Sequence, residues 1–111
     1  IYFRSKIAGG FMLDAELSLD FVQGLIKEEC DSVKNLLLEK NAKYGNSAIQ
    51  PKRIFSKQSS IEQIKVRIDD KLSRIQNMGF VDTSDEDTLK DLIGYLILLR
   101  VSHRVSKNPD K

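Results

Sequence analysis

Apolar residues in the N-terminal half of the chain recur at intervals of three and four, which is the spacing of one face of an α-helix. This segment begins after Ser18, whose side chain suits a helix N-cap, and ends near Lys43, just before Gly45. Its apolar positions are Phe21, Val22, Leu25, Ile26, Val33, Leu36 and Leu37. The pattern predicts one long amphipathic helix.

A second helical pattern follows a polar segment that contains Pro51, which we interpret as an ordered loop with at most one short helix, around Arg53. Ser59 and Glu62 then have the spacing of a capping box. The apolar stripe that follows is made of Ile61, Ile64, Ile68, Leu72 and Ile75. It predicts a second long helix, which ends near Gly79.

The third helical segment, from Asp87 to Val101, is the most apolar part of the chain, and Ser84 and Asp87 have the spacing of a helix start. One polar ridge interrupts its apolar surface, formed by Asp87, Thr88, Asp91, Tyr95 and Ser102. A carboxylate such as that of Asp91, on a helix directed to the interior, needs a cation, a hydrogen-bond donor or a metal ion. Asp91 is therefore either half of a structural ion pair with a Lys or Arg, or a functional acid.

These patterns predict an all-α fold, a helical bundle of three long helices with short connecting elements, and no stretch requires a strand. We expect residues 12–111 to form a single domain, and we set residues 1–11 aside as an added leader because they precede Met12. The third helix would expose too much apolar surface in a single copy. We therefore expect a homo-oligomer, a dimer or tetramer.

Charge and cysteine content narrow the possible partners. The 18 basic and 16 acidic side chains leave a net charge of +2, which does not favour duplex nucleic acid. No apolar run is long enough to span a membrane. The single cysteine, Cys30, indicates a reducing compartment, so we expect a cytoplasmic protein.

Acidic residues on the predicted helices suggest a metal site. Glu29, next to Glu28, lies in the apolar stripe of the first helix, and Asp69 and Asp70 lie on the second. Acids contributed by separate helices are what a divalent cation site in a bundle requires, and Asp91 would be another member. Alternatively, the flexible Glu29 side chain reaches solvent at the edge of the stripe.

Basic residues follow one ridge of the second helix, at Arg67, Lys71 and Arg74. Beside a metal ion, such a ridge suits a phosphate-binding site. Alternatively, it is a solvated face with internal salt bridges.

Three blocks of sequence carry a resemblance to a known family: KNAKYGNSA (40–48), VRIDDKLSRI (66–75) and DTLKDLIGYLILL (87–99). Their order and spacing resemble the phage and bacterial nucleotide modification-associated domain of the first type, which is related to the all-α, MazG-like nucleoside triphosphate pyrophosphohydrolases. In the MazG-like motifs E-E-x-x-E and E-x-x-D, Glu28, Glu29 and Asp91 match acidic positions. Ser32 and Thr88 stand at two other acidic positions of those motifs.

The resemblance implies a hydrolase that uses Mg²⁺ or Mn²⁺ to convert a nucleoside triphosphate to the monophosphate and pyrophosphate. The substrate would be dGTP or another deoxynucleotide in phage nucleotide metabolism. The implied metal-binding and catalytic residues are Glu28, Glu29, Asp70 and Asp91, and the implied substrate-binding residues are Lys43, Tyr44, Lys71, Arg74 and Tyr95. Two other classes remain open: a nucleotide-binding protein without turnover, favoured by Ser32 and Thr88, and a structural helical adaptor.

Overall fold

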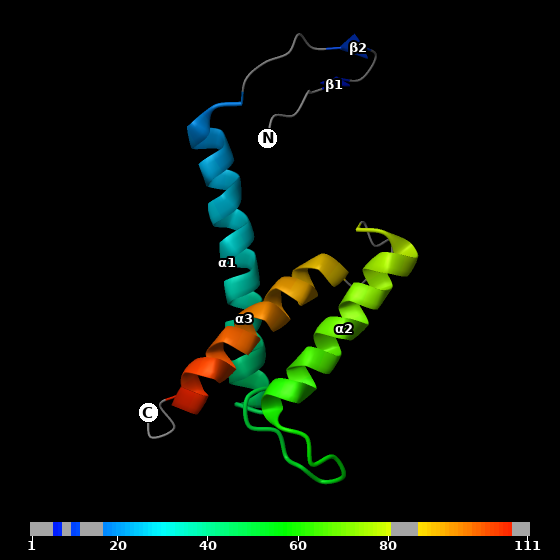
Figure 1. Cartoon of the computed structure of the whole chain (residues 1–111). Coiled ribbons are helices and arrows are strands. Elements are labelled where there is room, and N and C mark those ends of the chain that lie inside the picture. The colour runs from blue at the N-terminus through cyan, green and yellow to red at the C-terminus, as the bar shows by residue number, and fades with distance from the viewer. Residues whose placement is uncertain (1–5, 8–9, 12–16, 81–86, 108–111) are drawn as a thin grey trace. The chain divides into compact units, whose positions relative to one another are not determined.

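The computed structural model describes residues 6–7, 10–11, 17–80 and 87–107. Within these residues the chain forms three helices and one small hairpin (Figure 1). The helices are α1 (Leu19–Tyr44), α2 (Ser60–Met78) and α3 (Thr88–Lys107), and the strands are β1 (Lys6–Ile7) and β2 (Gly10–Phe11). The predicted all-α arrangement of three long helices is confirmed.

The chain divides into two compact units, Ile1–Ser32 and Val33–Lys111, which we name unit 1 and unit 2. Unit 1 holds the hairpin, in which β1 and β2 are antiparallel with Lys6 opposite Phe11, and the first part of α1. The hairpin lies in the stretch set aside as a leader, where no strand was expected. Unit 2 holds the rest of α1 together with α2 and α3.

The ends of α1 lie where the sequence predicts them. The Phe21 N–H donates to Ser18 Oγ at 3.1 Å, so Ser18 caps the first turn. The helix ends at Tyr44, and Gly45 follows with a φ of +67°, in the left-handed region that glycine adopts most easily.

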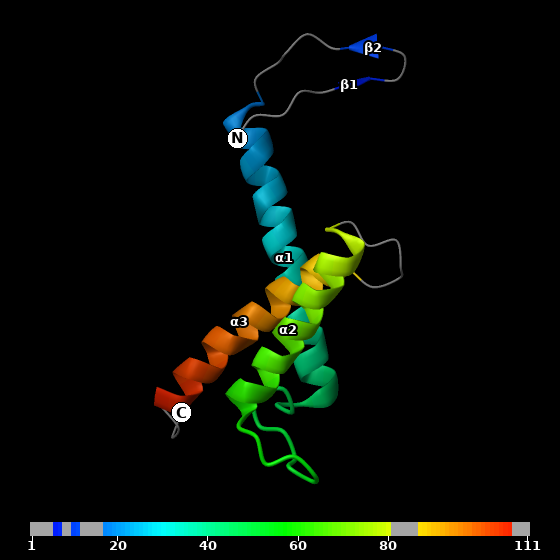
Figure 2. The ribbon, with the colours of Figure 1, turned by 45° about the vertical axis from the view of Figure 1, so that its right-hand side comes forward.

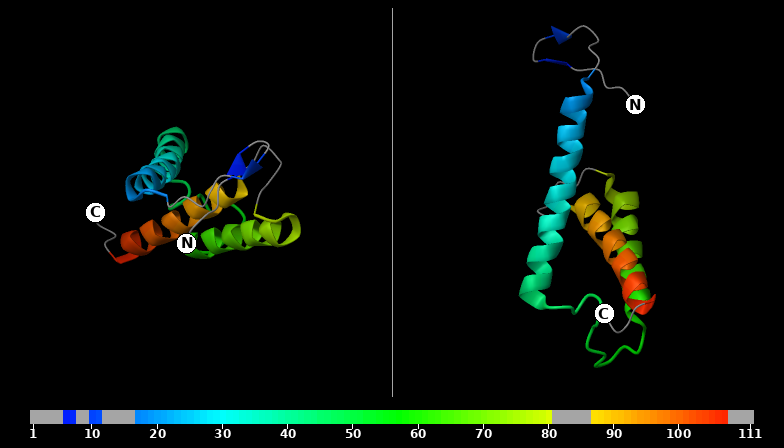
Figure 3. Two further views of the ribbon diagram at one scale, coloured as in Figure 1. Left: turned by 90° about the horizontal axis from the view of Figure 1, so that it is seen from above. Right: turned by 90° about the vertical axis from the view of Figure 1, so that its left-hand side faces the viewer.

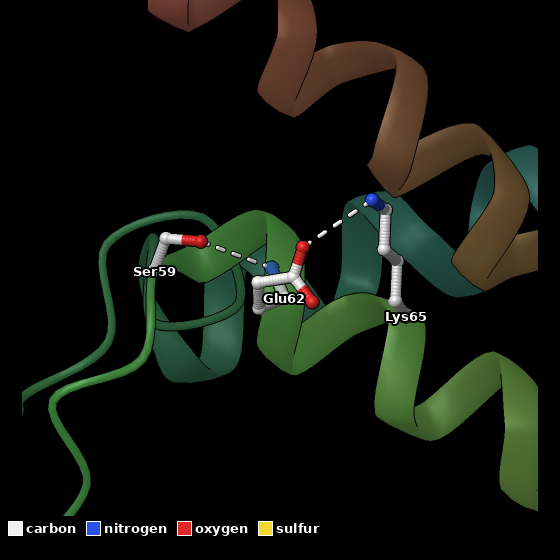
Figure 4. A network of polar contacts seen from close by, with 3 residues as sticks. All are labelled: Ser59, Glu62 and Lys65. Carbon is white, nitrogen blue, oxygen red and sulfur yellow. Dashed lines mark hydrogen bonds and ion pairs between the residues drawn. The ribbon is translucent and has the colours of Figure 1, made fainter.

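The N-terminus of α2 is capped by Ser59, whose Oγ accepts a hydrogen bond from the Glu62 N–H at 3.1 Å (Figure 4). The Glu62 carboxylate forms an ion pair with Lys65 at 3.3 Å. At the other end, the Gly79 N–H donates to the Ile75 carbonyl oxygen. The predicted bounds of α2 are therefore confirmed.

The loop before α2 differs from the prediction of a short helix around Arg53, because residues 51–59 are not helical. The structure forms a turn earlier, where the N–H groups of Ile49 and Gln50 donate to the Asn46 carbonyl oxygen at 2.9 and 2.7 Å. An irregular loop then continues to Ser59.

The N-cap of α3 is Asp87, whose Oδ1 accepts from the Lys90 N–H at 2.9 Å. Ser84, the other residue of the predicted helix start, lies outside the described residues. The helix continues beyond the expected end at Val101, to Lys107. Although α3 is strongly apolar, no helix in the described part of the chain is long and apolar enough to cross a membrane.

Helices α2 and α3 lie side by side in unit 2 and run in roughly opposite directions (Figures 2 and 3). Few apolar side chains are fully buried in the described part of the chain, namely Val33 of α1 and Ile64 of α2. The polar residues Lys71, Thr88 and Ser102 are buried as well. The buried residues of α3 are Thr88, Gly94 and Ser102, so two members of the polar ridge noted in the sequence lie on its inner face.

We expect Ser59→Ala to lower the free energy of unfolding by about 1 kcal/mol, because the Glu62 N–H loses its partner in the first turn of α2. Urea denaturation monitored by circular dichroism measures the change. Ser73→Ala is the matched control, since Ser73 is exposed in the middle of α2, where alanine is the better helix former. An equal loss in both variants would contradict a capping role.

Candidate functional site

A pocket of about 560 Å³ lies within unit 2. Its walls come from the last turns of α1, the turn after α1, the first turns of α2 and the middle of α3. The residues around it are Leu36, Leu37, Lys40, Asn41, Tyr44, Gly45, Asn46, Ser47, Ala48, Ile49, Pro51, Gln63, Ile64, Arg67, Asp91, Gly94, Tyr95 and Leu98. An apolar pocket with a few convergent polar groups is typical of a small-molecule site.

The polar groups of the pocket suit an anion that carries an aromatic ring. Lys40 and Arg67 provide two cationic side chains, and a guanidinium can bind phosphate oxygens in a bidentate manner. Tyr44 and Tyr95 provide aromatic rings, on which a nucleobase can stack. Asp91 is the one acidic side chain among the lining residues.

The wall formed by the turn after α1 is held by the side chain of Asn41. Its Nδ2 donates to the Gly45 carbonyl oxygen at 3.1 Å and to Asn46 Oδ1 at 2.9 Å. The Asn46 carbonyl oxygen in turn accepts hydrogen bonds from the N–H groups of Ile49 and Gln50. These bonds fix the turn against the end of α1, so the wall keeps its shape without a ligand.

Gly94 allows α3 to approach α1 closely at the base of the pocket. A Cβ atom at this position would lie 3.4 Å from Leu37 Cδ2. Alanine would just fit, whereas a longer side chain would have to displace Leu37 or the helix. The glycine lies one turn after Asp91 and directly before Tyr95, and both of these residues line the pocket with the end of α1.

Asp91 forms an ion pair with Lys71 of α2, with 3.3 Å between Oδ2 and Nζ. The two side chains are only 27% and 11% exposed. The pair thus joins α2 to α3 in a partly buried position, where a charge has to be compensated. The structural ion pair considered for Asp91 is present, and the same residue also lines the pocket.

The structure brings some predicted site residues to the pocket and places others elsewhere. Asp91, Tyr44 and Tyr95 line it. The Lys43 ammonium lies 5.2 Å from the centre of the Tyr44 ring, as in a cation–π contact. Lys71, Lys43, Asp70 and Arg74 are not among the lining residues; Asp70 is exposed on α2 and Arg74 is partly exposed there.

Glu28 and Glu29 are exposed on the part of α1 that belongs to unit 1. Their convergence with Asp70 and Asp91 around a metal ion therefore stays a prediction. Among the described residues, no three His, Cys, Asp or Glu side chains come together as a metal-binding group.

Several pocket residues were not assigned to the site from the sequence, namely Lys40, Asn41, Asn46 and Gln63, and Arg67 was considered only as part of the basic ridge. A signal was present for most of them. Lys40, Asn41 and Asn46 belong to the KNAKYGNSA block, and Arg67 begins the basic ridge of the second block. Gln63 had no such signal, because it precedes that block and only its position on α2 brings it to the pocket.

Comparisons with known proteins give no relative for this chain. No family model matches it, and neither a curated protein nor a solved structure is found to match.

We expect Lys71→Met to lower the free energy of unfolding by about 2 kcal/mol, because the partly buried Asp91 carboxylate loses its cation. A double-mutant cycle with Asp91→Asn, measured by urea denaturation, isolates the pair, and we expect a coupling energy of about 1–2 kcal/mol.

Lys65→Met is the control for burial, because Lys65 and Glu62 form an ion pair of the same 3.3 Å length with both side chains more than half exposed (Figure 4). Removal of this pair should cost less than about 0.5 kcal/mol. Similar losses for Lys71→Met and Lys65→Met would show that burial adds nothing to the Lys71–Asp91 pair.

Proposed function

We propose that the pocket of unit 2 binds a nucleoside triphosphate, and that the protein hydrolyses it to the monophosphate and pyrophosphate with Mg²⁺ or Mn²⁺. One observation carries this proposal: the pocket draws residues from all three sequence blocks of the family resemblance. The first block contributes the end of α1 and its turn, the second contributes Arg67, and the third contributes Asp91, Gly94, Tyr95 and Leu98. Because all three segments of the resemblance line one cavity, we expect them to contact the same ligand.

The cationic and the aromatic side chains of the pocket would contact different parts of the nucleotide. Arg67 and Lys40 would bind phosphate oxygens, because charge-assisted hydrogen bonds to phosphate are the strongest polar contacts that this pocket can offer. Tyr44 and Tyr95 would contact the base or the sugar. As part of the same proposal, the first candidate for the substrate is dGTP or another deoxynucleotide.

The donor set of the pocket suits one divalent ion that arrives with the substrate. Mg²⁺ is commonly held by one or two carboxylates together with substrate phosphates, and Asp91 supplies one carboxylate. When bound, the ion would polarise the attacked phosphoryl group and neutralise charge on the departing pyrophosphate. Asp91 would hold it, and Lys71 would position the Asp91 carboxylate. Glu28, Glu29 and Asp70 remain proposed further ligands.

A nucleotide-binding protein without turnover is the second candidate, and the Lys71–Asp91 ion pair favours it. The Lys71 ammonium, 3.3 Å from the carboxylate, already compensates its charge. A metal ion at Asp91 has to compete with this ammonium, which weakens the hold of a single carboxylate on the ion.

We also propose that the protein acts in the cytoplasm as a homo-oligomer, a dimer or tetramer. The lone cysteine, Cys30, supports the location. The large apolar side chains exposed on α1 and α3 support the self-association.

For binding, we expect one or more nucleoside triphosphates with Mg²⁺ to raise the Tm, because a ligand that binds only the native state stabilises it. Arg67→Met should raise the Kd of that ligand about tenfold or more, since a charged contact to phosphate is lost. Isothermal titration calorimetry measures the Kd. Arg53→Met, in the exposed loop outside the pocket, should leave it unchanged. No Tm shift with any common triphosphate would contradict the binding proposal.

For turnover, we expect the preferred triphosphate to yield monophosphate and pyrophosphate with Mg²⁺ or Mn²⁺, as resolved by chromatography. Asp91→Asn should reduce turnover by about 100-fold or more, because the carboxylate that would hold the ion is lost. The assay is run well below the Tm of the variant. Glu39→Gln, exposed on α1 outside the pocket, serves as the control. Tight binding with no pyrophosphate released would favour the second candidate instead.

A further inference from the structure

The outward face of α3 carries a continuous apolar stripe. Its members are Leu89, Ile93, Leu96, Ile97 and Val101, which are between 38% and 46% exposed. The opposite face of the same helix is polar and buried: Thr88 is 3% exposed and Ser102 is 1% exposed. Within unit 2, the helix therefore buries its polar ridge and leaves large aliphatic side chains in water, where each exposed Å² is unfavourable.

The spacing of this stripe is symmetric. Leu89, Ile93, Ile97 and Val101 follow one another at intervals of four, and the midpoint of the series is residue 95. A two-fold axis through that midpoint, perpendicular to the helix, places Leu89 opposite Val101 and Ile93 opposite Ile97 of an antiparallel copy. Such self-complementarity is the requirement of a two-fold interface.

We propose that this stripe is the interface with a second copy of the chain, formed by two antiparallel α3 helices. The proposal deepens the homo-oligomer proposed above and rests on it, but it does not depend on the nucleotide chemistry. The stripe exposes on the order of 300 Å² of apolar surface per copy. A standard interface buries about 800 Å² per partner, a little over half of it apolar, so the stripe supplies much of the apolar centre that a dimer needs.

The charges beside the stripe predict how salt affects the dimer. The same two-fold axis places Lys90 near Arg100 of the other copy, so like charges face each other at the edges of the contact. Added salt screens this repulsion, and the dimer should become tighter as the ionic strength rises. An acidic partner protein on this basic-edged surface would show the reverse dependence.

The first experiment measures the molar mass of the full chain by size-exclusion chromatography with light scattering, over a range of concentrations. We expect a dimer for the wild-type protein, and at least a 100-fold higher dissociation constant for Ile93→Glu, because a buried carboxylate would face an apolar surface. Val66→Glu is the matched control, since Val66 is an exposed apolar residue of α2. A wild-type monomer would overturn both the homo-oligomer and this surface, whereas an Ile93→Glu dimer would overturn the surface alone.

A second experiment tests the orientation without introducing charge. In a Cys30→Ser background, Ile93→Cys and Ile97→Cys chains are mixed and oxidised. An antiparallel contact predicts that the mixture forms a 93–97 disulfide faster than either variant alone forms a disulfide with itself. Preferential self-coupling of each variant would overturn the antiparallel arrangement. Dissociation by Phe21→Glu and not by Ile93→Glu would place the interface on unit 1 instead.

Discussion

The ion pair between Lys71 and Asp91 is the constraint that sets the orientation of α3. Lys71 is 9% exposed, and a buried ammonium is tolerated only beside a compensating charge. If α3 were rotated to bury its aliphatic stripe, Asp91 would turn away from α2 and Lys71 would lose that charge. The pair therefore favours the rotation that turns Asp91 toward α2, and in this rotation the aliphatic stripe faces outward.

The helices could be predicted from the sequence because their starts and ends depend on local chemistry. Ser18 and Ser59 cap α1 and α2 through N–H groups three residues ahead, and Gly45 and Gly79 follow their last turns. The start of α3 was expected at the pair Ser84 and Asp87; of these two residues the structure describes Asp87, which accepts a hydrogen bond from the Lys90 N–H. No short helix forms around Arg53, and the apolar side chains beside it, Ile54 and Phe55, are 71% and 95% exposed, so no packing contact stabilises one.

The candidate site was harder to predict, because periodicity identifies the face of a helix but not the neighbour that the face meets. Asp91 stood out since a carboxylate on an apolar helix is rare, yet its pairing with Lys71 depends on how α2 and α3 pack. Lys71 itself was expected to contact phosphate, as part of an exposed ridge. Gln63 is an ordinary helix residue in sequence, and only the tertiary structure brings it to the pocket.

The electrostatics of the pocket favour an anionic metal–phosphate complex over a free metal ion. Two cationic side chains, Lys40 and Arg67, stand against one lining carboxylate, and that carboxylate is compensated by Lys71. A bare divalent cation would meet an environment of like charge, whereas a triphosphate that carries Mg²⁺ keeps a net negative charge and is attracted. The ion pair also holds Asp91 in one orientation before a ligand arrives, so binding does not have to order that side chain. In the proposed function, the contact that weakens Asp91 as a ligand for free metal would also prepare it to receive a metal delivered by substrate.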